Sequence, residues 1–319
     1  MLVYFEWNDN MRKNALIICC YTCAIGAFGA FFRWLQNQIC YDAVTNTMKG
    51  GGWGILILLV ILAAAAVFYM LVKKLFDKNL VPPTKLYQVF HGTTIIFPIV
   101  FWLVSIICVL GGVITVTSTR FDPQAGIYAI IGMLAILSGI GFPLICTCAQ
   151  KRYNPKFISI LMTLPVLMFA FWLIASYRQN ATIPSVGVYA VEIVAICSCL
   201  VAFFYTSGYA YGIARPVESM IATMFAAFMC FMTVSDSRYL GLQLILVAGA
   251  GMLLAENWML ISNMQEKEET EEPIPELTAE NAEDSVLSPK LEDIIEEAVA
   301  EQTTIVDEDD DVKIWKSEK

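Results

Sequence analysis

Eight long apolar runs are the feature that most constrains how this chain can fold. A helix needs about 20 mostly apolar residues to cross the roughly 30 Å hydrocarbon core of a bilayer. The runs are continuously apolar and do not alternate as barrel strands do, so they predict helices. The predicted spans are residues 14–35, 53–72, 89–115, 126–148, 157–176, 187–210, 217–234 and 239–262. We therefore expect an all-α polytopic membrane protein, a bundle of about eight transmembrane helices.

The spans differ in strength. The span at residues 53–72 contains no charged residue, whereas the span at residues 217–234 is close to the lower length limit. The first run is too long for a signal peptide and ends in Phe-Phe-Arg-Trp, not in a small-residue cleavage site. We interpret it as a retained helix.

Charge divides the chain into two parts. Residues 263–319 hold 20 of the 29 acidic residues and only 5 of the 20 basic ones, so the net charge of −9 comes from this tail. The tail is poor in apolar residues and highly charged, which predicts a disordered acidic C-terminal segment. The acidic balance also argues against nucleic acid, whose phosphates need a basic surface.

The distribution of Lys and Arg predicts an orientation. If the N-terminus is cytoplasmic, the cytoplasmic side collects ten Lys and Arg residues and the outer side five, and an even number of spans places the tail in the cytoplasm. We expect a multi-pass protein of the plasma membrane with both termini inside. The ten are Arg12, Lys13, Lys73, Lys74, Lys78, Lys85, Lys151, Arg152, Lys156 and Arg215; the five are Arg33, Lys49, Arg120, Arg178 and Arg238.

The ends of two predicted spans resemble each other. The third ends in Thr-Val-Thr-Ser-Thr-Arg-Phe at residues 115–121, and the seventh in Thr-Val-Ser-Asp-Ser-Arg-Tyr at residues 233–239. This favours two four-helix halves in parallel orientation. The alternative is that arginine and aromatic rings recur because both anchor helices at the membrane interface.

Two carboxylates fall inside the predicted spans. An ionisable group at the bilayer centre costs about 2.5–3.5 kcal/mol or more, so such residues are candidate functional groups. Glu192 and Glu256 each lie a few residues from a span end. They could bind a cation or relay a proton, or they could pair with Arg178 or Arg215 near the interface, and their shallow depth favours pairing.

No catalytic or metal-binding constellation is predicted. His91 is the single histidine and starts the third span, so a His-based metal site is not available. It is nevertheless a polar candidate at a span end. Cysteines near the inner ends of spans one and four could bind Cu(I), but they lack ligand spacing and more commonly pack as small apolar residues. These are Cys19, Cys20, Cys23, Cys146 and Cys148. We expect no cofactor.

The tail contains one segment with helical periodicity. Ser288-Pro289 resembles an N-cap followed by a first-turn proline, and Leu291, Ile294, Ile295 and Ala298 share one face of a helix over residues 289–302. A second apolar group contains Ile314 and Trp315. Such segments are typical of docking to a groove on a partner protein.

Two classes of function therefore remain. The first, which we favour from the sequence, is a non-catalytic membrane platform or regulatory protein whose tail engages a cytoplasmic protein. The second is a small-solute transporter or permease built from two four-helix halves. Besides the lipid bilayer, the tail partner is the only partner predicted, and no enzyme activity is expected.

Overall fold

The computed structural model describes residues 9–42, 47–48, 52–76, 80–90, 96–119, 126–151, 155–181, 186–236 and 238–266. All of them belong to one compact unit, Met1–Lys267, and Glu268–Lys319 form a second unit. The predicted docking residues of the tail and His91 lie outside the described residues.

Eight of the described helices are long and apolar enough to cross a membrane, which confirms the predicted all-α polytopic fold. They are α1 (Asp9–Cys40), α2 (Gly52–Phe76), α4 (Ile96–Thr119), α5 (Gly126–Gln150), α6 (Pro155–Asn180), α7 (Ala190–Gly208), α8 (Pro216–Thr233) and α9 (Leu240–Ser262). Two short helical elements accompany them, α3 (Leu86–Val89) and the 3-10 helix η2 (Val186–Val188).

The helix ends differ from the ends of the apolar runs. Helix α1 continues to Cys40 through Gln36 and Asn37, because polar residues can extend a helix beyond the stretch that must be apolar. The third span was predicted from residue 89, but α4 begins at Ile96 and the preceding turn forms the separate helix α3.

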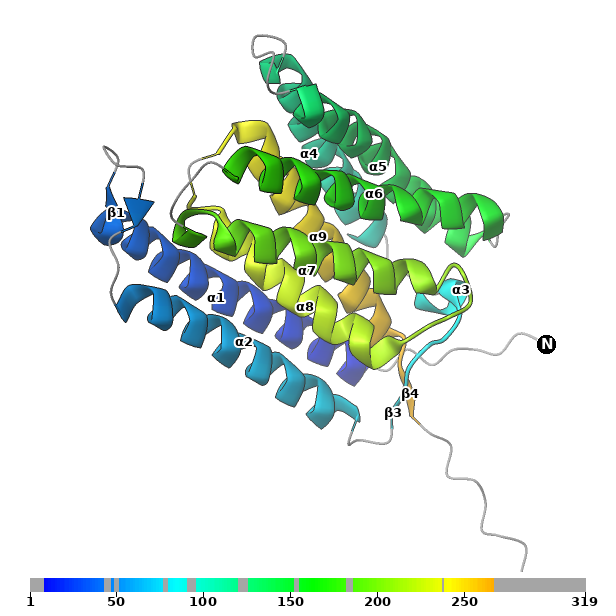
Figure 1. The fold of residues 1–319 in the computed structure, drawn as a ribbon. Coiled ribbons are helices and arrows are strands. Elements are labelled where there is room, and N and C mark those ends of the chain that lie inside the picture. Colours follow the sequence, from blue (N-terminus) through cyan, green and yellow to red (C-terminus); the bar gives the residue numbers. More distant parts are fainter. Residues whose placement is uncertain are drawn as a thin grey trace, which may run out of the picture. The chain divides into compact units, whose positions relative to one another are not determined.

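Helices α8 and α9 lie inside the bundle (Figure 1). Helix α9 packs against α4, α8 and α1, and α8 packs against α1, α2, α7 and α9. Helices α4, α5, α6 and α7 pack in sequence. We call the end where α1 begins and α9 ends the terminal end of the bundle, and the opposite one the distal end.

The packing does not reproduce two equivalent four-helix halves. In the second half each helix packs closely against the next, including α7 against α8. The corresponding helices of the first half are α2 and α4, and between their described residues there is no comparable packing. The similarity of residues 115–121 and 233–239 is therefore not accompanied by equivalent packing of the two halves.

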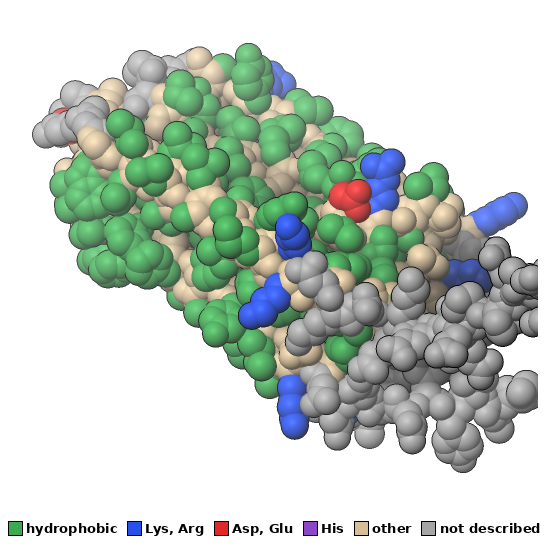
Figure 2. Space-filling model, turned by 90° about the horizontal axis from the view of Figure 1, so that it is seen from below, with side chains coloured by type: hydrophobic (Ala, Val, Ile, Leu, Met, Phe, Trp, Pro, Cys, Tyr) green, Lys and Arg blue, Asp and Glu red, His purple; other side chains and the backbone are tan. Residues whose placement is uncertain are grey.

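The most apolar span is the least buried, and the two least apolar spans are the most buried. Only 22% of the most apolar stretch of α2 is buried, against 61% for α8 and 72% for α9. A helix that faces lipid must be apolar all round, whereas an enclosed helix can carry polar residues. This explains why α8 is the weakest span by sequence. Figure 2 shows the apolar outer surface, with most of the Lys and Arg side chains toward the terminal end.

The outer face of α1 is also apolar. Its exposed large side chains run along the helix from Leu16 to Ile39, and they include Tyr21, Phe28 and Trp34. The opposite face packs on α8 and α9, where Gly26 leaves room for the ring of Phe231.

Glycines bring α4 into backbone contact with two neighbours. A Cβ added at Gly112 would lie 2.6 Å from the carbonyl oxygen of Gly132 on α5. A Cβ added at Gly111 would lie 2.9 Å from the carbonyl oxygen of Gly241 on α9. No other residue type permits such an approach, so these positions fix how closely α4 packs.

Two short antiparallel ribbons lie at the ends of the bundle. At the distal end β1 (Tyr41–Asp42) pairs with β2 (Thr47–Met48). At the terminal end β3 (Leu80–Val81) pairs with β4 (Gln265–Glu266), and the Asn263 amide donates to the Val89 carbonyl at 2.6 Å. The chain that leaves α9 is thus tied to the segment that follows α2.

Candidate functional site

A small pocket among polar and apolar residues lies toward the terminal end of α9. The polar residues that line it are Thr206 of α7, Tyr209 directly after α7, Ser219 and Thr223 of α8, and Glu256 and Asn257 of α9. The apolar residues that line it are Leu86, Val89, Phe90, Met162 and Leu260. The space open to the centre of a water molecule is about 20 Å³. One water needs about 10–15 Å³ by this measure, so the space is large enough for a single water molecule.

Glu256 and Asn257 are buried in this pocket without their full set of hydrogen bonds. Glu256 is 6% exposed and Asn257 is 1% exposed. Within the described part of the chain, Oε2 of Glu256 and both amide atoms of Asn257 have no hydrogen-bond partner. An unsatisfied buried polar group costs about 1–3 kcal/mol, and more when it is charged. Hydrogen-bond partners for these atoms must therefore come from outside the described residues.

Two hydroxyl groups near Glu256 hydrogen-bond to backbone carbonyls of their own helices. Thr206 donates its proton to the Phe203 carbonyl at 3.1 Å, and Thr223 donates to the Met220 carbonyl at 3.0 Å. Burial raises the pKa of the Tyr209 phenol above its usual value, so this group stays neutral. The pocket therefore combines one carboxylate with neutral oxygens.

The ligands around the pocket do not define a metal site. Soft transition metals prefer thiolate or imidazole, and among the described residues no three His, Cys, Asp or Glu side chains gather into a metal site. An anion would meet the Glu256 carboxylate.

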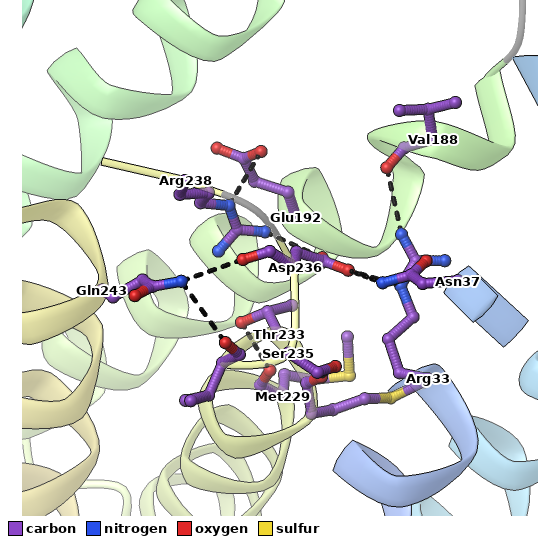
Figure 3. Close-up of polar contacts among 12 residues, drawn as sticks. Arg33, Asn37, Val188, Glu192, Met229, Thr233, Ser235, Asp236, Arg238 and Gln243 are labelled. Carbon is purple, nitrogen blue, oxygen red and sulfur yellow. Dashed lines mark hydrogen bonds and ion pairs between the residues drawn. The ribbon is translucent and has the colours of Figure 1, made fainter. Parts of the chain in front are cut away.

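A second group of charged residues lies at the distal end (Figure 3). Arg33 of α1 is 1% exposed. Its Nε donates to Oδ1 of Asp236 at 2.8 Å, and Nη2 donates to the Val188 carbonyl at 3.0 Å. Asn37 also donates to Oδ1 of Asp236, at 2.9 Å. We call Arg33, Asn37, Glu192, Asp236 and Arg238 the distal cluster.

The distal cluster joins α1 and α7 to the turn between α8 and α9. Arg238 donates to Oδ2 of Asp236 at 3.0 Å, and its Nε lies 3.2 Å from Oε2 of Glu192. This second contact is an ion pair and not a hydrogen bond. Gln243 donates to the Asp236 carbonyl at 2.9 Å. Two arginines balance two carboxylates, so the cluster has no net charge and is built to hold the helices together.

The structure separates the two predicted carboxylates. Glu192 pairs with Arg238, not with Arg178 or Arg215, because Arg178 is exposed at the end of α6 and Arg215 lies at the terminal end. Glu256 faces the pocket, and no ion pair reaches it within the described residues. The two groups are at opposite ends of the bundle and form separate sites.

Sequence analysis missed the distal cluster. Arg33 and Arg238 were interpreted as interfacial residues, but both side chains are almost fully buried in ion pairs. Opposite charges at the same predicted depth, Arg33 and Glu192, are a signal that would have indicated pairing. The sequence also gave no sign that Cys199 and Cys230 lie together, with sulfur atoms 3.1 Å apart and both buried.

Fold and site together define a polytopic helical membrane protein with a small buried pocket beside Glu256 at one end and a neutral ion-pair cluster at the other. Comparison with known protein families, curated proteins and solved structures finds no match to the chain.

Proposed function

We propose that this protein is a membrane transporter for a small solute and that the pocket at Glu256 is its binding site. The observation that carries the proposal is the buried Oε2 of Glu256, which has no hydrogen-bond partner among the described residues. Intramembrane ionisable residues that face a cavity are typical of substrate and ion pathways.

The contrast with Glu192 supports binding over packing. Glu192 is neutralised by Arg238, whereas Glu256 and Asn257 share a pocket without such a partner. Apolar residues at both positions would be more stable, because burying an unpaired charge costs several kcal/mol. A bound solute or ion that supplies the missing partner would offset this cost.

The size of the pocket bears on how a solute would enter. Pockets for organic ligands measure about 300–1,000 Å³, far more than the space beside Glu256. A solute larger than a single ion would need α8 and α9 to separate from α3 and α7. Alternating access in transporters involves helix movements of this kind.

For the orientation, we propose that the terminal end faces the cytoplasm of the plasma membrane. The exposed cations at this end are Lys13, Lys73, Lys74, Lys85, Lys151, Lys156 and Arg215. At the distal end Arg33 and Arg238 are used in ion pairs. The excess of exposed cations at the terminal end supports the cytoplasmic assignment.

Transport can be tested in proteoliposomes loaded with a panel of radiolabelled amino acids and primary amines. We expect the wild-type chain to exchange at least one probe faster than protein-free vesicles, and Glu256→Gln to slow that exchange about tenfold or more. Arg178→Met, which alters an exposed residue, is the control. Equal exchange by the wild type and Glu256→Gln would contradict the proposal.

A second candidate function is the membrane platform with a protein-binding tail. Its support is the concentration of 20 acidic residues in residues 263–319, together with the β3–β4 ribbon that fixes where the tail starts. Removal of Glu268–Lys319 keeps this ribbon and should abolish co-purification of a cytoplasmic partner. Ile294→Asp with Ile295→Asp should do the same if the predicted helix docks. An unchanged set of co-purified proteins would exclude this function.

A further inference from the structure

We infer that residues 80–90 form a strap that closes the pocket beside Glu256, and that residues 263–266, where the chain leaves α9, are a latch that holds this strap in place. The strap contains β3, two prolines and α3. The inference deepens the proposed function and rests on it only for the effect of the strap on transport, because closure of the pocket can be measured without transport.

The strap supplies one apolar side of the pocket. Leu86, Val89 and Phe90 are three of the eleven residues that line it, and the others lie on or directly after the long helices α6, α7, α8 and α9. Val89 and Phe90 are buried, and the ring of Phe90 packs against that of Phe101 on α4. A helix as short as α3 is unstable by itself, so its position depends on its contacts.

Closure of the pocket keeps water away from polar groups. Oε2 of Glu256 and the amide of Asn257 are buried and have no hydrogen-bond partner among the described residues. Burial of such atoms without a partner is unfavourable, whereas an open pocket would let water reach them. The unsatisfied atoms therefore favour opening, and contacts elsewhere in the protein must keep the strap closed.

The latch contacts the strap at two points. Nδ2 of Asn263 donates to the Val89 carbonyl at 2.6 Å, at the end of the strap that lines the pocket. The same nitrogen donates to the Met259 carbonyl at 3.0 Å, which fixes the side chain on α9. At the other end of the strap, β3 pairs with β4 in an antiparallel ribbon (Figure 1). Both ends of the strap are thus held by the segment that follows α9.

The residues between β3 and α3 connect these two points rigidly. The rings of Pro82 and Pro83 fix the φ angles there. Oε1 of Gln88 accepts from the backbone N–H groups of Thr84 and Lys85, at 3.3 and 3.1 Å. Because this connection has little conformational freedom, a displacement of β3 is passed on to α3.

The latch lies between the pocket and the acidic tail. Asn263 follows Glu256 by about two helical turns of α9, and the tail continues directly from β4. Anything that draws β4 away from β3 would therefore also release the wall of the pocket. The start of the tail becomes the point at which access to Glu256 is controlled.

The test is labelling of Glu256 in the full chain by a water-soluble carbodiimide with glycine ethyl ester, located by mass spectrometry. We expect little labelling of the wild type, because the strap closes the pocket to water. Asn263→Leu nearly keeps the size of the side chain but removes the donor to Val89. Labelling of Glu256 should rise about fivefold or more, since loss of one hydrogen bond shifts a local opening equilibrium by about this factor.

Ser262→Ala is the matched control. Ser262 is the neighbouring residue, and its hydroxyl has no hydrogen-bond partner among the described residues. This variant should label like the wild type. Hydrogen exchange of the same proteins gives a second measurement. In Asn263→Leu the amides of α3, which donate to carbonyls within residues 85–86, should exchange faster while those of α8 stay unchanged.

Three results would overturn the inference. These are strong labelling of Glu256 in the wild type, equal labelling of Asn263→Leu and Ser262→Ala, and exchange that accelerates in α8 as much as in α3. If solute exchange in proteoliposomes depends on Glu256 but Asn263→Leu labels like the wild type, the transporter stands and the strap is refuted. Faster labelling of Asn263→Leu, with no solute exchange by the wild type, would leave the strap standing and refute the transporter.

Discussion

At the scale of single residues, the surroundings of a carboxylate decide what it can do. Asp236 accepts from Arg33, Asn37 and Arg238 and is saturated. Glu256 lies in an equally buried position but has an oxygen without a partner among the described residues. The first arrangement stabilises the fold, whereas the second leaves a buried oxygen unsatisfied.

We predict that Asp236→Asn lowers the free energy of unfolding by about 3 kcal/mol or more, because it leaves the buried Arg33 without its counter-charge and the distal cluster with a net positive charge. Arg33→Met should have a similar effect. The double variant should be less destabilised than the sum of the two, since the remaining partner is no longer stranded. Thermal unfolding in detergent measures all three.

Arg178→Met serves as the reference for these variants, because Arg178 is exposed and surface charges contribute about 0–1 kcal/mol. If Asp236→Asn unfolds at the same temperature as Arg178→Met, the distal cluster does not hold the bundle together.

The sequence identified Glu192 and Glu256 because a charge inside an apolar run is visible without a structure. It could not identify their surroundings. The partner of Glu192 is Arg238, and Arg33 meets Asp236 across 203 positions of the chain. Such contacts depend on the rotation and neighbours of each helix, which apolar periodicity in α1 or α7 does not encode.

At the scale of helices, apolarity predicted which segments cross the membrane because lipid imposes that requirement on each span separately. It did not predict where helices end, as the polar last turns of α1 and the separate α3 show. Apolarity also made α8 the weakest predicted span, because α8 is largely enclosed by other helices and can be less apolar than a helix that faces lipid.

For the contact of α4 with α5, we predict that Gly132→Ala lowers the free energy of unfolding by about 1–3 kcal/mol. The new methyl group would lie 2.8 Å from the Gly112 carbonyl oxygen and 2.7 Å from a methyl carbon of Val116, so the helices must move apart. Chemical or thermal unfolding in detergent measures the loss.

Gly126→Ala is the matched control in the same helix, because a Cβ there meets nothing within 4 Å. This variant should be neutral or slightly stabilising, since alanine favours a helix more than glycine does. Equal losses for both variants would show that helix propensity, not the contact with α4, explains the result.

At the scale of the whole molecule, the two ends of the bundle differ in chemistry. The terminal end has exposed cations, the pocket beside Glu256 and the β3–β4 ribbon. The distal end has its buried charges balanced within the protein. This asymmetry is stronger than the ten-to-five ratio of Lys and Arg in the sequence, because two of the five outer-side cations, Arg33 and Arg238, are used in ion pairs.

We predict that reporter domains fused after Lys319 and inserted in the loop after Cys40 report opposite sides of the membrane, with the first in the cytoplasm. Eight spans and the positive charge of the terminal end are the physical reasons. Activity of a cytoplasmic reporter at both sites would mean an even number of crossings between them, which contradicts the seven spans predicted there.

The long outer face of α1 makes the thickness of the bilayer relevant to this protein. The exposed apolar side chains from Leu16 to Ile39 extend about 35 Å along the helix axis, whereas the hydrocarbon core measures about 30 Å. The mismatch is relieved when α1 tilts or the surrounding lipid thickens. Because Arg33 connects the same helix to Asp236, a change in lipid chain length would act directly on the distal cluster.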